Sequence, residues 1–331
     1  MIRFAWRQFR AQAAVAAAGL AALAVVAGVV AGARADGSLR AWLGVLVIVV
    51  PALTGMFWGA PLAAREFEEG TFRLVWTQSV TRLRWLAVRF GVAGLTSMAA
   101  AGLLSIVVTW WSGPLDRAAA NQFGTFDQRD IVPVGYAAFA FALGVLAGML
   151  IRRTLPAMAV TLAGFVAARL AVLTWVRPRL ISPVALNLAL NPGSTGYGQA
   201  GTLSVLFGRP TLMPAPPDLP NAWITSMRIV GAHGAGLTTA ALDRACPGIG
   251  QGRGGGGGGA GGGLGHSQAP QSVVTRLQDC VAKIGTSYHE AVTYQPASRY
   301  WPLQWYEFAI FFAAALVLAA ACLWRIRRAG A

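Results

Sequence analysis

The sequence predicts an all-α integral membrane protein with six transmembrane helices and a mixed extracytoplasmic domain between the fifth and sixth helices. Three observations lead to this class. Of the 331 residues 56% are hydrophobic and only 12% are charged, with a mean hydropathy of +0.55, an unusual balance for a water-soluble domain. Six apolar runs are long enough to cross a bilayer. One long polar stretch, residues 177–302, separates the last two runs.

The chain is strongly basic, with a formal net charge of +15. In a soluble domain this charge would suggest a nucleic-acid partner. Many of the arginines flank apolar runs instead, which is typical of residues that set the orientation of membrane helices. We therefore expect a lipid bilayer, and no nucleic acid, around this protein.

The first predicted helix covers residues 11–33 and follows the basic lead Arg3, Arg7 and Arg10. The alternative is a signal peptide cleaved near Ala33 to Ala35, where the A-x-A spacing is present. The apolar run is longer than the 7 to 15 residues of a signal-peptide core, which favours a helix that is retained.

The second predicted helix covers residues 41–60, and Pro51 in its middle predicts a kink because proline removes a helical hydrogen bond.

A densely charged segment, residues 61–89, follows the second predicted helix. Its charged residues are Arg65, Glu66, Glu68, Glu69, Arg73, Arg82, Arg84 and Arg89. They are too many for hydrocarbon, so the segment should lie in water beside the membrane. Gly70 should end a helical extension, and Thr71 and Thr81 can cap the helices that follow.

The remaining predicted helices cover residues 85–111, 131–150, 155–176 and 303–324, with a loop over 112–130 and a tight turn at Arg152 and Arg153. Arg169 is the exception in apolar runs that otherwise carry almost no charge. It lies near the outer end of the fifth helix. We favour an arginine that snorkels to water over one that contacts substrate or gates a path.

Arginines are distributed unequally between the two predicted sides of the membrane. Thirteen lie at the N-terminus, in segment 61–89, at the 152–153 turn and at the C-terminus, against four in the short loops of the other side. The positive-inside rule then places both termini in the cytoplasm of a multi-pass cell-membrane protein. The predicted organisation is residues 1–176 with five helices, residues 177–302 outside, and residues 303–331 with the sixth helix and a cytoplasmic tail.

The outer domain should contain a strand over residues 223–230, short helices over 238–244 and 272–284, and a glycine-rich tether over 248–265. Cys246 and Cys280 bracket the tether on the side where oxidation is permitted, so we predict a disulfide between them. Two buried free thiols are the alternative.

Catalytic and metal-binding motifs are weak in this chain. The glycine run has no lysine at the spacing of a phosphate-binding loop. His289 and Glu290 are not followed by a second histidine at the zinc-protease spacing, and Ser194 lacks the context of a nucleophile elbow. We expect no catalytic residue, no metal site and no cofactor bound by this chain.

Two stretches resemble a known family. Residues 65–71, R-E-F-E-E-G-T, followed by S-V-T-R at 79–82, resemble the loop between the second and third helices of ABC-2 type transporter permeases. Residues 294–307, Y-Q-P-A-S-R-Y-W-P-L-Q-W-Y-E, are similar to a subset of actinobacterial permeases of this type with a large outer loop. The resemblance implies a membrane subunit of an ATP-driven exporter, moving an amphiphilic or hydrophobic substrate outward.

In such permeases the loop forms a coupling helix that docks on a separate ATP-binding subunit, which holds ATP and Mg. A second permease chain, identical or a sister, is also implied. The positions that match or surround this motif are Arg65, Glu66, Glu68, Glu69, Gly70, Thr71, Leu74, Val75, Trp76 and Arg82. A solvated loop that only sets topology is the alternative for this segment. For the whole chain the alternatives are a scaffold or sensor with a ligand-binding outer domain and, more distantly, an intramembrane hydrolase using Ser194, His289 and Glu290.

Overall fold

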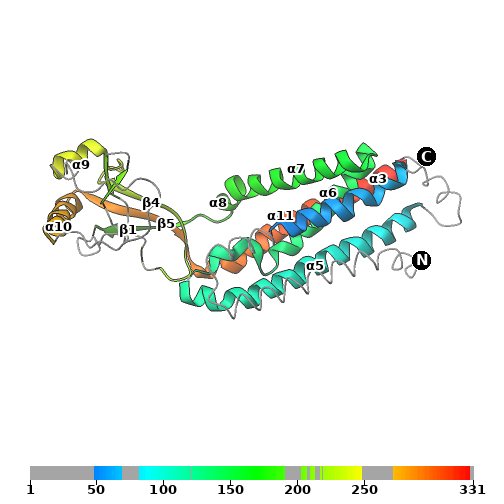
Figure 1. Ribbon diagram of the computed structural model, residues 1–331, viewed down its shortest axis with the longest axis horizontal. Helices are drawn as coiled ribbons and strands as arrows, with labels where there is room; N and C mark the ends of the chain where they lie inside the picture. Colours follow the sequence, from blue (N-terminus) through cyan, green and yellow to red (C-terminus); the bar gives the residue numbers. More distant parts are fainter. Residues whose placement is uncertain are drawn as a thin grey trace. The chain divides into compact units, whose positions relative to one another are not determined.

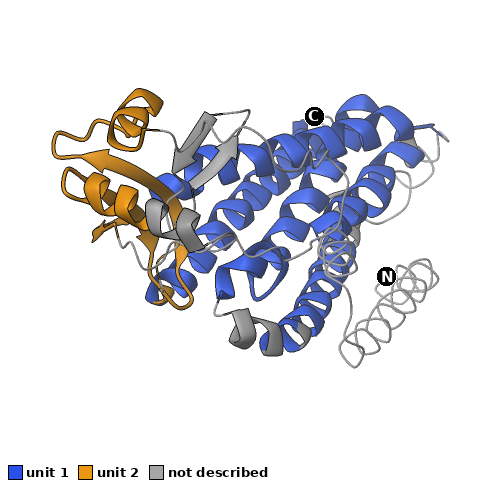
Figure 2. Ribbon diagram, turned by 60° about the vertical axis from the view of Figure 1, so that its left-hand side comes forward, with its two compact units in different colours: residues 1–182, 298–331 blue, residues 183–297 orange. Residues whose placement is uncertain are grey.

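The computed structural model describes residues 48–68, 82–119, 121–190, 203–206, 209–212, 217, 219–247 and 271–328. The chain divides into two compact units (Figure 2). A helical unit contains residues 1–182 and 298–331, and a sheet unit contains residues 183–297. The sheet unit is therefore an insertion between two segments of the helical unit.

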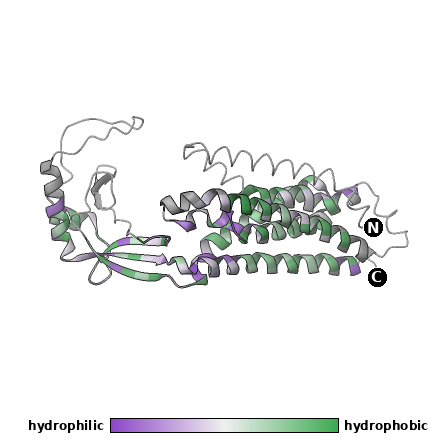
Figure 3. Ribbon diagram, turned by 90° about the horizontal axis from the view of Figure 1, so that it is seen from below, coloured by the Kyte–Doolittle hydropathy of each residue, from purple (hydrophilic) through white to green (hydrophobic). Residues whose placement is uncertain are grey.

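The helical unit (Figure 1) is built from helices. Residues 48–54 are helical and lead into η1 (Gly55–Gly59), α3 (Ala60–Glu68), α5 (Arg82–Ala119), η2 (Gln122–Gln128), α6 (Val132–Ile151), α7 (Thr154–Ala171), η3 (Val172–Val176), α8 (Arg177–Leu180), η5 (Ala297–Arg299) and α11 (Tyr300–Arg328). Apolar residues dominate the long helices (Figure 3).

Five helical segments of the described chain are long and apolar enough to cross a membrane. They are Ile48–Arg65, Phe90–Trp110, Gln122–Ile151, Thr154–Leu180 and Ala297–Arg328. These match the second to sixth predicted helices in order. The first predicted helix, residues 11–33, lies outside the described residues.

Helix α6 forms the core of the helical unit. It contacts α3, α5, α7 and α11. Its sequence is apolar on every face, as expected for a helix surrounded by other helices. The majority of the residues in Gln122–Ile151 are buried, whereas few in Ala297–Arg328 are. The outer helices thus use one face for α6 and leave broad apolar surfaces for lipid or another chain.

Small residues bring η1, α3 and α6 into close contact. Gly55 and Gly59 on one side face Gly144 and Gly148 on the other, so each side carries a G-x-x-x-G pair. A Cβ atom at Gly59 would lie 2.6 Å from the backbone oxygen of Phe141, closer than real side chains approach. Only glycine allows this approach of two helix backbones, a packing mode typical of membrane helices. Residues 48–54 stay helical through Pro51 and enter the π-helix η1 at Gly55.

The connection between α5 and α6 is more ordered than the predicted loop over 112–130. Helix α5 continues to Ala119, and the short 3₁₀ helix η2 follows. The rings of Phe123 and Phe126 in η2 stack on one another, with their centroids 6.0 Å apart. Both rings contact the ring of Tyr300, with centroid distances of 5.3 and 5.4 Å. This aromatic contact holds η2 against the first turn of α11.

The sheet unit contains a three-stranded antiparallel sheet in the order β1-β5-β4. Its strands are β1 (Val184–Ala189), β4 (Trp223–Gly231) and β5 (Tyr288–Gln295), and a separate hairpin joins β2 (Leu203–Leu206) to β3 (Arg209–Leu212). Helices α9 (Thr239–Ala245) and α10 (Gln271–Gly285) complete the described part. Strand β4 and both helices agree with the sequence prediction to within about one residue. The other four strands were not predicted.

Cys246 and Cys280 are joined in a disulfide, with their Cα atoms 5.4 Å apart. Both are buried, together with Ile229, Leu242 and Ile284. The disulfide closes a loop of 34 residues, and loop entropy alone would make it worth about 3 to 4 kcal/mol to the folded unit. It therefore links α9 and α10 at the two ends of the predicted glycine-rich tether, whose residues 248–265 lie outside the described chain.

Candidate functional site

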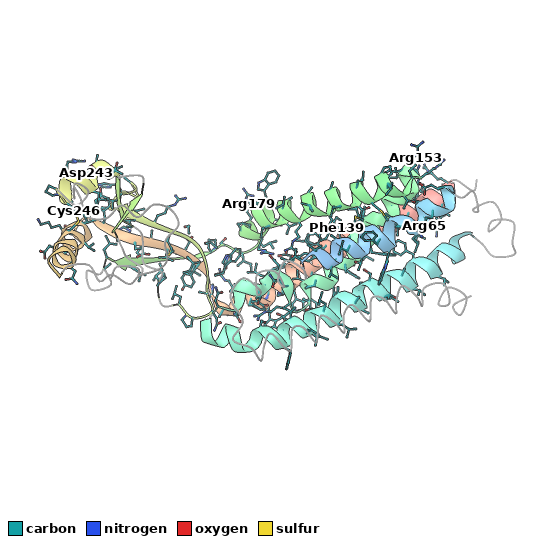
Figure 4. All side chains as sticks on the ribbon, in the orientation of Figure 1. Arg65, Phe139, Arg153, Arg179, Asp243 and Cys246 are labelled. Atoms are coloured by element: carbon teal, nitrogen blue, oxygen red, sulfur yellow. A yellow bond between two sulfur atoms is a disulfide. The ribbon has the colours of Figure 1, made fainter. Side chains whose placement is uncertain are left out.

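The helical unit has two ends with different chemistry, which we call the Arg152 end and the Tyr300 end. At the Arg152 end, α6 ends at Ile151 and Arg152 adopts a left-handed backbone conformation with φ 57°, so that α7 can begin at Thr154. Arg65 and Arg153 lie at this same end (Figure 4). Arg325, Arg327 and Arg328 of the last turn of α11 are exposed. The predicted tight turn is present.

Only part of the docking segment predicted over residues 61–89 is described. Helix α3 carries Arg65, Glu66 and Glu68, and α5 begins at Arg82. Arg65 and Glu68 are exposed, whereas the structure does not describe the side chains of Glu66 and Arg82. Glu69, Gly70, Thr71, Leu74, Val75 and Trp76 also lie outside it. The docking role of this segment stays a prediction.

Glu68 makes a contact that the sequence did not suggest. Its carboxylate accepts hydrogen bonds from the backbone N–H of Thr154, at 2.9 Å, and from the Thr154 hydroxyl. These bonds satisfy free donors in the first turn of α7, the usual role of a helix cap. They hold the pKa of Glu68 below its ordinary value, the Thr154 hydroxyl first and its backbone N–H second. The last residue of α3 thus attaches the docking segment to the beginning of α7.

The Tyr300 end contains a group of buried charges that we call the arginine cluster: Asp127, Tyr136, Arg169, Arg177 and Glu307. Arg177 binds Glu307 through two parallel hydrogen bonds, Nε to Oε2 and Nη2 to Oε1, each 2.8 Å long. The same Nη2 also contacts Asp127. The Tyr136 hydroxyl donates to Glu307. Such two-pronged arginine–carboxylate bonds fix both distance and orientation.

Arg169 of α7 also belongs to the arginine cluster and precedes Arg177 along the chain. Its Nη2 lies 3.1 Å from Asp127 Oδ2, and its guanidinium lies over the Tyr136 ring, 4.3 Å from the centroid. Asp127 is therefore shared by two arginines. The cluster carries two acids and two arginines, so its formal charges balance.

The π-helix η3 explains how both arginines reach the same acid. Residues eight apart in an α-helix differ by about 80° in direction, which would separate Arg169 from Arg177. A π-turn takes up roughly one extra residue, which reduces the difference to about 20°. Because η3 covers Val172–Val176, it lies between the two arginines and places them on one face.

A second polar group continues the cluster along η2. Arg129 donates from Nε to the Tyr300 hydroxyl at 2.7 Å and from Nη1 to Ser112 at 3.2 Å. Gln304 donates to the Phe126 carbonyl at 2.9 Å and accepts from Val132 N–H at 3.2 Å. These bonds tie the start of α11 to α5, η2 and α6.

Two sequence expectations are corrected here. Arg169 does not snorkel to water, because its side chain is 12% exposed and pairs with Asp127. Charge within the membrane segments is also more extensive than Arg169 alone, since Glu307 lies inside the predicted sixth helix and its side chain is 2% exposed. A glutamate within an apolar run was a readable signal, whereas Asp127 looked like an ordinary residue of a polar loop.

The residues considered for hydrolysis or metal binding do not form a site in the described chain. Among the described residues, no group of three or more His, Cys, Asp or Glu side chains could hold a metal ion. His289 and Glu290 are neighbours on β5, where successive side chains point to opposite faces. Ser194 lies outside the described residues.

Comparison with known proteins identifies the membrane part. Residues 33–177 match a family model described as ABC-2 membrane transporter related. This part of the chain is similar to the ABC-2 type permeases. The resemblance stated from the R-E-F-E-E-G-T stretch is thereby confirmed. No curated protein and no solved structure gave a significant match.

The ABC-2 match begins before the second predicted helix and ends at Arg177. It therefore includes the docking segment, the turn at Arg152 and three residues of the arginine cluster besides Arg177 itself. The sheet unit and α11 lie beyond it, so Glu307 reaches the cluster from outside the matched region. The chain is a multi-pass membrane protein, and its residues 33–177 resemble a family of transporter membrane subunits.

Proposed function

We propose that this chain is the membrane-spanning permease subunit of an ATP-driven exporter, powered by a separate ATP-binding subunit that docks on residues 61–89. The ABC-2 match over residues 33–177 carries the proposal. It also favours transport over a scaffold, sensor or hydrolase. In this account ATP and Mg stay on the partner subunit, and a second permease chain completes the path.

The charge distribution supports the orientation of the proposed transporter. The Arg152 end carries exposed arginines from α3, from the α6–α7 turn and from α11. By the positive-inside rule this end faces the cytoplasm, and so does the docking segment. The ATP-binding subunit then meets the docking segment on the side where ATP is present.

The bond between Glu68 and Thr154 supplies a physical route from the docking segment to the membrane helices. Helix α3 ends at Glu68, and the segment that should contact the partner follows directly. A displacement of this segment would pull on the first turn of α7 through two hydrogen bonds. Closure of the ATP-binding subunit could thus move α7.

The pairing of charges supports a substrate of low charge. The four charged side chains of the arginine cluster are committed to one another. The surfaces of α7 and α11 expose large apolar residues such as Val160, Leu316 and Val317. An amphiphilic or hydrophobic substrate, moved outward, suits such surfaces better than a highly charged one.

The test is purification of the tagged chain from its native membranes in mild detergent, with identification of the proteins that accompany it. The docking variant is Glu66→Arg with Glu69→Arg, which leaves the Glu68 cap intact. The control is Asp243→Arg with Asp279→Arg, an equal charge change at exposed residues of the sheet unit. We expect an ATP-binding subunit to copurify with the wild type and with the control. The amount that copurifies with the docking variant should be lower by about tenfold or more. Full retention by the docking variant would refute docking on this segment, and no ATP-binding subunit with any form would refute the exporter.

A further inference from the structure

Helix α7 is held by little apolar packing. Few residues of the segment Thr154–Leu180 are buried, as in the other outer segment Ala297–Arg328, whereas the majority of Gln122–Ile151 is buried. The buried positions of α7 are Ala157, Thr161 and Phe165, all before Arg169. Towards the Tyr300 end its contacts with the other helices are therefore increasingly ionic.

Every ion pair of the arginine cluster joins the α7 segment to a different element. Arg169 and Arg177 come from α7 and α8, whereas Asp127 comes from η2 and Glu307 from α11. No ion pair of the cluster lies within the α7–α8 segment or between η2 and α11. Separation of α7 from its neighbours would break all of these pairs together, so the contact has two distinct states instead of a gradual range.

The cluster is also suited to being opened. A buried ion pair adds little net stability compared with apolar packing, because both charges must leave water. One nitrogen of Arg169, Nη1, is buried without a hydrogen-bond partner among the described residues, so this arginine is incompletely satisfied in the present arrangement. The π-helix η3 between the arginines is of the kind that often marks a hinge.

We propose that the arginine cluster is a latch: it holds the Tyr300 end of α7 against η2, α6 and α11, and that end moves away when the pairs break. The Arg152 end of α7 stays attached through Glu68 and Thr154. The latch is a property of this chain alone. It rests on the proposed function only for the event that opens it, a pull on Glu68 from the docked subunit.

The test measures distances by pulsed electron paramagnetic resonance in the full chain, reconstituted in lipid nanodiscs without any partner. Spin labels replace Trp110 on α5 and Trp175 in η3, both 68% exposed, in a Cys322→Ala background. A control pair at Leu155 and Trp324 reports on the Arg152 end, where both residues are also exposed.

We expect Arg177→Glu, which faces Asp127 and Glu307 with a like charge, to raise the population with long Trp110–Trp175 distances about tenfold. The exchange Arg177→Glu with Glu307→Arg should restore the wild-type distribution, and the control pair should not change. A Trp110–Trp175 distance distribution of Arg177→Glu equal to that of the wild type would overturn the latch. Failure of the charge exchange to restore the wild-type distribution would also overturn it.

If the like-charge variants do not insert, Asp127→Asn decides, because it removes the ion pairs of Asp127 with both Arg169 and Arg177 and introduces no like charge. A larger long-distance population in this variant supports the latch, and an unchanged one overturns it. Since no ATP-binding subunit is present, this result is independent of the purification that tests the exporter.

Discussion

Glu68 illustrates how a charged residue in a docking segment can serve the fold of its own chain. Its place within the R-E-F-E-E-G-T stretch suggested a contact with the docking partner. The carboxylate instead caps α7 through Thr154. The helix N-terminus attracts a negative charge, and Arg153 and Arg65 add to this attraction. Glu66 and Glu69 are therefore better candidates for the partner than Glu68.

The Glu68 cap should depend on pH. Its pKa is lowered in the folded protein from the usual 4.5, so its contribution is present above that value and is lost as the pH falls through the lower, folded pKa. Thr154→Ala should therefore lower the thermal stability of the purified protein at pH 7, and by less below pH ~4. Thr154→Ser keeps the hydroxyl and should resemble wild type at both pH values. An equal loss of thermal stability from Thr154→Ala at both pH values would contradict the role of Glu68 as a cap of α7.

Arg177 shows why part of the site was invisible in the sequence. It stands at the end of the fifth predicted helix, where a solvated arginine is ordinary. Its partners, Asp127 and Glu307, come from positions 50 and 130 residues away along the chain. No local pattern reports such a contact. Glu307 was the signal available in the sequence, since an acid inside a membrane helix needs a partner.

At the scale of elements, the close packing of η1 and α3 on α6 depends on glycine. Gly144→Ala would place a methyl group against backbone atoms of Gly55 and Ala60, which cannot move without shifting a helix. We expect a loss of about 1 to 3 kcal/mol, measured by thermal unfolding in detergent. Gly91→Ala on α5 is the matched control, since nothing lies within 4 Å of its added Cβ. It should be neutral or stabilising, because alanine favours helix. Equal effects of the two substitutions would contradict the packing.

The membrane elements were largely predictable, whereas the sheet was not. Apolar runs define α6, α7 and α11 to within a few residues because a bilayer imposes both length and composition. Strands β1 and β5 pair Val184 with Tyr294 and Ala189 with His289, about 100 residues apart along the chain. Their short alternating patterns carry little information without the partner strand. The position of η2 likewise depends on Tyr300, far along the chain.

For the whole molecule, orientation can be tested with two labelled arginines of Figure 4. Arg153 lies at the Arg152 end and Arg179 near the other end of the same helical segment, and both are exposed. In intact cells a membrane-impermeant maleimide should react with Arg179→Cys and not with Arg153→Cys. Both should react after the membrane is permeabilised. The reverse pattern in intact cells would invert the topology and would place the docking segment outside.

These contacts describe a continuous path through one chain. Glu68 lies in the docking segment and caps α7, and α7 and α8 carry Arg169 and Arg177 to the arginine cluster. Each step is a polar contact that can break and form again without repacking the core around α6. A force applied at the Arg152 end could in this way change the Tyr300 end, which a membrane transporter requires.

A photocrosslink from residue 76 tests directly whether an ATP-binding subunit docks on residues 61–89. Trp76 is replaced by p-benzoylphenylalanine in the full chain, native membranes are irradiated, and the adducts are identified by mass spectrometry. Trp301, exposed at the Tyr300 end, is the matched control position. We predict an adduct with a polypeptide carrying ATP-binding motifs from position 76 and none from position 301. Adducts with lipid alone at position 76, or an ATP-binding partner captured only at position 301, would contradict the account.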